Sequence, residues 1–149
     1  MLDRDKVLAA ARAADQARGS GAKLGRLHGL LIPVKDSVNT RAYMTTNGTK
    51  WLTGFRPDDD AGVLKPLMAA GAIVMGKTNL HELSMCWTSD SASFDQVPNP
   101  SDVTCVPAGG RRGAAAGCRG PPGSSGLAWG TPSASSITQR AAGVSAAPP

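Results

Sequence analysis

The pattern of apolar and polar positions predicts a helix at the start of the chain. Residues 3–18 are rich in Ala, Arg and Leu, and Asp3 or Asp5 is a suitable cap for the first turn. Gly19-Ser20-Gly21 follows and ends the helical pattern. Because the apolar face of this helix is weak, we expect it to pack on the outside of a larger core.

Two short apolar runs predict buried strands. Residues 30–34 form the first, and Pro33 within it favours a sheet edge or a strand end. Residues 72–75 form the second. The alternation of helices with these strands predicts an α/β fold.

Between the two strands, residues 60–70 predict a helix. The acidic run 58–60 suits a helix N-terminus, and Gly71 suits its C-terminal end. Pro66 inside this segment should kink the helix or shift its start. After the second strand, Asn79 and Glu82 have the spacing of a capping pair for a short helix.

The composition changes at Pro107. Of the 43 residues from there to the end, 31 are Gly, Ala, Pro or Ser, and the large aliphatics are only Leu127, Ile137 and Val144. Such a segment buries too little apolar surface to offset its ordering entropy. We therefore divide the chain into a domain over residues 1–106 and an irregular, low-complexity tail over residues 107–149.

Charge and cysteines narrow the class of protein. The net charge is +5, and residues 107–149 contain four arginines but no Asp, Glu or Lys. The three cysteines do not form a C-x-x-C pair, so zinc spacing is absent, and their odd number favours reduced thiols. The sequence has neither a secretion signal nor an apolar run of membrane-spanning length. We expect a cytoplasmic protein.

Motifs spread over residues 5–106 resemble the amidase-signature family. They are Leu27-His28-Gly29, Pro33-Val34-Lys35-Asp36, Asn39-Thr40, Thr45-Thr46-Asn47-Gly48, Ala70-Gly71-Ala72, Gly76-Lys77-Thr78-Asn79, His81-Glu82-Leu83-Ser84, Thr88-Ser89 and Asn99-Pro100. The resemblance implies the N-terminal portion of that α/β fold, with a mixed sheet flanked by helices. Within the family, the stretch 81–89 is most similar to mandelamide and indoleacetamide hydrolases.

The resemblance implies hydrolysis of a carboxylic amide to acid and ammonia, without metal or cofactor. In this family a serine attacks the amide carbonyl, and a second serine links it to a lysine that acts as general base. Lys35 matches that lysine. An exposed lysine has a pKa of about 10.4, so a general base at this position requires burial, which depresses the value. Lys35 directly follows an apolar strand, although without the surrounding motif a surface pair with Asp36 is the simpler interpretation.

The expected serine relay is altered. Where the family has Gly-Gly-Ser-Ser-Gly-Gly, this chain has Gly109-Gly110-Arg111-Arg112-Gly113. Arginine does not lose its proton in proteins and cannot relay one. A one-base shift of the reading frame near codon 107 accounts for three features: Arg-Arg in place of Ser-Ser, the loss of acidic residues, and the sequence rich in Gly, Ala and Pro. We expect a truncated chain that is inactive as an amidase.

The nucleophile of the family follows about two dozen residues after the relay serine. Ser136 lies at that distance and is matched to the nucleophile, but the usual Asp-Thr-Gly before it is missing, and a plain serine in low-complexity sequence is the alternative.

Other sites have less support. His81-Glu82 lacks the second histidine of a zinc-protease motif, because position 85 is Met85. Lys77 follows the second apolar run, and we expect a structural role for it. The sparse arginines of the tail, with one aromatic among them, argue against a nucleic-acid binder. Two hypotheses remain: an amidase acting on a small-molecule amide, or a non-catalytic fragment.

Overall fold

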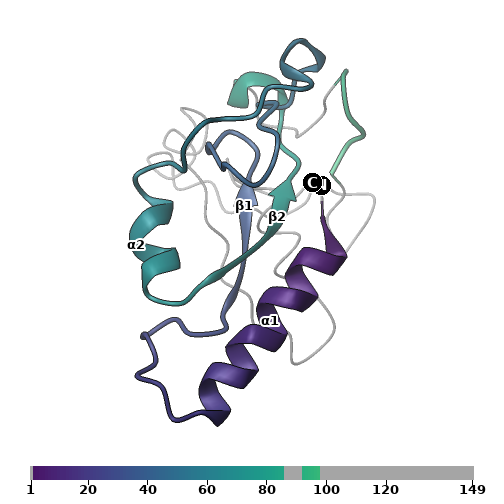
Figure 1. The fold of residues 1–149 in the computed structure, drawn as a ribbon. Coiled ribbons are helices and arrows are strands. Elements are labelled where there is room, and N and C mark those ends of the chain that lie inside the picture. Colours follow the sequence, from purple (N-terminus) through teal and green to yellow (C-terminus); the bar gives the residue numbers. More distant parts are fainter. Residues whose placement is uncertain (1, 86–91, 98–149) are drawn as a thin grey trace, which may run out of the picture.

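The computed structural model describes residues 2–85 and 92–97, and these form a small α/β unit (Figure 1). Two parallel strands lie side by side at the centre, with helices on either side of them in this view. The elements are α1 (Arg4–Gly19), β1 (Leu31–Lys35), η1 (Lys50–Leu52), α2 (Leu64–Ala69), β2 (Ile73–Thr78) and η2 (Glu82–Ser84), where η marks a 3-10 helix. The α/β prediction is confirmed for this part of the chain.

Helix α1 begins and ends where the sequence predicts. The Asp3 side chain accepts a hydrogen bond from the Lys6 backbone N–H, which satisfies a donor of the first turn. Ser20 caps the C-terminal end. The helix contacts β2 but has no fully buried residue. Its place outside the core follows from its weak apolar face.

The strands pair in parallel, with an irregularity at the proline. Ile32 lies opposite Val74, but Pro33 lies opposite Gly76, so Met75 is an extra residue on β2. Proline has no backbone N–H to donate, and this is where the register shifts. The expected mixed sheet is represented in the described residues by these two strands and one isolated antiparallel bridge from Leu2 to Gly76.

Helix α2 is shorter than the sequence predicts. It starts at Leu64, so Pro66 falls in its first turn, where a missing N–H does no harm. The prediction that the acidic run 58–60 begins the helix is wrong, because these residues lie in the loop before it. Leu64 is fully buried and packs with Val34 and Val38 as the core cluster.

A close approach of two backbone segments constrains the start of β2, and side-chain hydrogen bonds follow its end. Gly71 has φ 97°, and a Cβ built there would lie 2.8 Å from His28 Cα, so only glycine fits between α2 and the 25–30 loop. At the other end, the predicted capping pair of Asn79 with Glu82 is wrong. The Asn79 side chain instead accepts from the Leu80 N–H and donates to the Asp95 carbonyl.

Within the described ranges, no helix is both long and apolar enough to cross a membrane. The tail predicted for residues 107–149, with Arg111, Arg112 and Ser136, lies outside the described residues.

Candidate active site

Lys35 is the last residue of β1 and is almost completely buried, with 1% of its surface exposed. Its Nζ donates a hydrogen bond to Ser84 Oγ in η2 at 2.9 Å. The alternative of a surface pair between Lys35 and Asp36 is wrong, because Lys35 is inside the fold and Asp36 pairs with a different lysine. The general-base role of Lys35 stays a prediction.

The two strands present two lysines to opposite faces of the sheet. Successive side chains along a strand alternate between faces. Lys77 is opposite Val34 in the register, whereas Lys35 is opposite Thr78. The side chains of Lys35 and Lys77 therefore leave the sheet on different sides, and each enters its own environment.

Lys77 is held by a dense polar network. Its Nζ donates to the Val38 carbonyl at 2.5 Å, to Thr45 Oγ1 at 2.9 Å and to Thr40 Oγ1 at 3.2 Å. It also lies 3.5 Å from Asp36 Oδ1. Burial lowers the pKa of the Lys77 ammonium, and the Asp36 carboxylate only partly offsets this effect. These contacts use the donors of the ammonium group for structure, as expected of Lys77.

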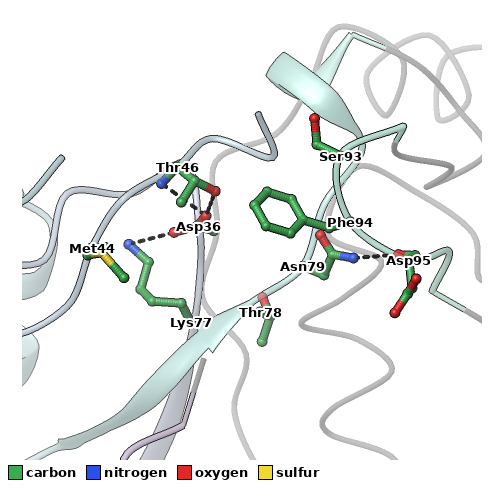
Figure 2. Close-up of a pocket in the computed structure, with 9 residues that line it drawn as sticks. All are labelled: Asp36, Met44, Thr46, Lys77, Thr78, Asn79, Ser93, Phe94 and Asp95. Carbon is green, nitrogen blue, oxygen red and sulfur yellow. Dashed lines mark hydrogen bonds and ion pairs between the residues drawn. The ribbon is translucent and has the colours of Figure 1, made fainter. Parts of the chain in front are cut away.

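Asp36 joins this network to the next loop. Its Oδ2 accepts hydrogen bonds from both the backbone N–H and the hydroxyl of Thr46, the former at 3.0 Å (Figure 2). The Asp36 N–H donates to the Thr78 carbonyl, and its own carbonyl accepts from the Asn47 N–H. Asp36 thus fixes the chain just after Lys35 to both β2 and the 45–48 loop.

A cavity of about 400 Å³ opens beside this ion pair. Figure 2 shows Phe94 projecting between the Asp36–Lys77 pair and Asn79. The lining residues are Asp36, Met44, Thr46, Lys77, Thr78, Asn79, Ser93, Phe94 and Asp95. Neither Lys35 nor Ser84 lines it, so the cavity lies beside the Asp36–Lys77 pair and does not include the Lys35–Ser84 contact.

Sequence reasoning missed two features of the site. One is the Lys35–Ser84 contact, which joins residues 49 positions apart. The other is the set of buried threonines around Lys77. A signal for the placement of Lys77 existed. Lys35 directly follows the first apolar run, Lys77 follows the second after Gly76, and the two parallel strands end at the same edge. Among the described residues, no group of three or more His, Cys, Asp or Glu side chains is placed to hold a metal.

Comparison with known proteins shows the family of this chain. The sequence matches the amidase family over residues 1–139, and the chain therefore belongs to the amidase-signature family. The match runs past residue 107, where the composition changes, and takes in the segment with Arg111, Arg112 and Ser136.

Individual relatives align with most of this chain. A glutamyl-tRNA(Gln) amidotransferase subunit of Chloroflexus aurantiacus is 44% identical over 115 residues, or 77% of this chain and 24% of that protein. The crystal structure of peptide amidase from Stenotrophomonas maltophilia superposes with a TM-score of 0.67 and 37% identity, over 78% of this chain and 24% of that one. The corresponding amidotransferase subunit from Thermotoga maritima gives a TM-score of 0.59 and 33% identity, over 63% of this chain and 21% of that one.

The chain spans about a quarter of the length of these relatives. It corresponds to their N-terminal portion. The relatives named above are a peptide amidase and two amidotransferase subunits, rather than mandelamide or indoleacetamide hydrolases.

Proposed function

We propose that this sequence carries the lysine-bearing part of an amide hydrolase that uses a Ser-Ser-Lys mechanism, with Lys35 as general base. The observation that carries the proposal is the buried amine of Lys35 in hydrogen-bond contact with a serine hydroxyl. A base of this kind needs a dry surrounding and a hydroxyl partner within about 2.6–3.2 Å. The names of the relatives, peptide amidase and glutamyl-tRNA(Gln) amidotransferase, both refer to amide chemistry.

In the chain as written, we propose that the proton relay is interrupted at Arg111 and Arg112. A guanidinium carries its proton permanently and cannot relay one. Removing one member of a catalytic unit costs about a millionfold in turnover. We therefore expect this chain to leave amides unhydrolysed.

The reading frame supplies the experiment. Translation of the coding DNA in the other frames after codon 106 should recover Gly-Gly-Ser-Ser-Gly and, about two dozen codons later, a Gly-Ser motif. The protein read in that frame should release ammonia from benzamide- or phenylacetamide-type substrates. Lys35→Ala in the same protein should lose that activity by about a millionfold, and the chain as written should show none.

Two results would contradict this proposal. One is the absence of these motifs from both alternative frames. The other is amide turnover by the chain as written that disappears in Lys35→Ala and in Ser136→Ala, which would give Ser136 the nucleophile's role despite its altered surroundings.

A second candidate function is a non-catalytic fragment, and Arg111-Arg112 favours it. Under this alternative, Arg111-Arg112 belongs to the correct reading frame, the other frames contain neither motif, and the chain shows no Lys35-dependent turnover. For the amidase, the proposed substrate is a small-molecule carboxylic amide in the cytoplasm. Aryl-substituted amides are the first substrates to assay, because the stretch 81–89 resembles hydrolases that act on such amides.

A further inference from the structure

We propose that Ser84 and Lys35 form a nucleophilic Ser–Lys pair that takes an acyl group from reactive carboxylic esters. This inference shares Lys35 with the proposed function, but it needs neither the Ser-Ser relay nor Ser136. Its basis is the 2.9 Å contact between Lys35 Nζ and Ser84 Oγ. That separation lies within the range that identifies a nucleophile and its base.

The two members of the pair have different exposure, as the chemistry requires. Lys35 is 1% exposed, so water does not compete for its amine. Ser84 is partly exposed, and the residue after it, Met85, is 78% exposed. The serine therefore lies between the buried lysine and the exposed Met85, and we propose that a small ester approaches it from that side.

The turn that carries Ser84 is held in a costly conformation. Leu83 has φ 51° and Ser84 has φ 58°, although neither is glycine. Left-handed backbone at such residues costs energy and persists only where the surroundings impose it. Here the Leu83 N–H donates to the Asn47 carbonyl at 2.9 Å and the Ser84 N–H to the His81 carbonyl at 2.8 Å. These bonds hold the Ser84 hydroxyl against Lys35.

The same hydrogen bonds define the class of substrate. The Ser84 N–H is used by the His81 carbonyl and the Met85 N–H by the Glu82 carbonyl, so the turn offers neither of them to a developing oxyanion. Donors of that kind usually contribute a factor of about 10²–10³. Without them we expect reaction with esters that have a good leaving group, and not with amides.

The acyl transfer balances with these two residues alone. When the Lys35 amine is neutral, the Ser84 O–H donates to Nζ across the same contact. Ser84 Oγ attacks the carbonyl carbon and its proton passes to Lys35. The bond from that carbon to the leaving oxygen breaks, and Lys35 returns the proton to the leaving group. Water then hydrolyses the acyl-serine by the same route and releases the acid.

The test is acetylation of the full chain by p-nitrophenyl acetate, with the acetylated residue located by mass spectrometry. We expect acetyl on Ser84. Lys35→Met should slow that reaction by about a hundredfold or more, the usual contribution of a positioned base. Ser84→Gly should abolish it while tolerating the positive φ, so this loss does not come from collapse of the turn. Leu83→Gly, which keeps the hydroxyl, should retain it.

The other outcomes overturn the proposal. Acetyl found only on Ser136, on lysine amines or on no residue would show that Ser84 is not activated. An unchanged rate in Lys35→Met would show that Lys35 is not its base. The amide assay uses the frame-restored protein, whereas the acetylation assay uses the chain with its present sequence. The two proposals can therefore fail independently.

Discussion

The Lys77 ammonium lies 3.5 Å from Asp36 Oδ1, and the two side chains are only 2% and 12% exposed. This pair connects the end of β2 with the residue that directly follows Lys35. The residue next to the lysine of the candidate site is therefore paired with a second lysine, whose side chain leaves the opposite face of the sheet.

Removal of Lys77 should destabilise the fold strongly. Lys77→Met leaves the Asp36 carboxylate buried without its cation, a change that typically costs about 3–5 kcal/mol. The urea midpoint should fall accordingly. The double variant Asp36→Asn/Lys77→Met should recover part of the loss, because no lone buried charge remains.

Lys65→Met is the matched control. Lys65 pairs with Asp59 at the surface, where both side chains are more than half exposed, so its removal should leave the midpoint close to that of the unaltered chain. Equal shifts for Lys65→Met and Lys77→Met would contradict the structural role of the buried pair.

Tyr43 should titrate at unusually high pH. Desolvation raises the pKa of its phenol above the ordinary 10.0, and it is the only tyrosine in the chain, so tyrosinate absorbance reports this group alone. The midpoint should lie above 10.0 in the folded chain and return to about that value in urea.

The raised pKa of Tyr43 also determines the direction in which the stability of the fold changes with pH. The pKa is higher in the folded state, so the contribution of Tyr43 is full below the unfolded value and is lost as pH rises through the folded one. Above pH 10, the free energy of unfolding measured in urea should fall for the unaltered chain, and this fall should be absent in Tyr43→Phe. A midpoint unchanged by urea would refute the burial of this phenol.

Gly48 should control the position of Ser84. Its φ is 75°, and a Cβ there would lie 3.1 Å from both the Leu80 carbonyl oxygen and Glu82 Cα. Gly48→Ala should displace the η2 turn and slow acetylation of Ser84 by about tenfold or more, because small misplacements of reacting groups are costly.

Gly54→Ala separates displacement from backbone strain. Gly54 has a similar φ of 95°, but nothing lies within 4 Å of its Cβ position. The Ser84 rate should be unchanged in this variant. If both substitutions slow the reaction alike, general backbone strain is responsible instead of contact with the turn.

Leu64 should be the most sensitive position of α2. It is 0% exposed in the core cluster, so Leu64→Ala leaves a cavity and should cost about 2–5 kcal/mol by urea unfolding. Met68→Ala, on the same helix at 42% exposure, should cost much less. Similar costs at the two positions would mean that α2 is not held by its buried face.

The sequence by itself determined the elements whose causes are local. The Asp3 cap and the Gly19-Ser20-Gly21 end fixed α1 to within a residue, and the two apolar runs located β1 and β2. Pro66 correctly indicated a shifted helix start. The motif around Lys35 indicated the family, because sequence neighbours form it.

Only the tertiary structure decided the partners of the polar side chains. Asp36 is adjacent to Lys35, yet it pairs with Lys77, because parallel pairing sets the two lysines on opposite faces. Asn79 and Glu82 have the spacing of a cap, but Asn79 bonds Asp95 instead. Ser84 meets Lys35 across 49 positions of chain, through a turn that its own residues do not favour. Such contacts depend on how β1, β2 and the loops after them pack together, and local sequence patterns do not predict this packing.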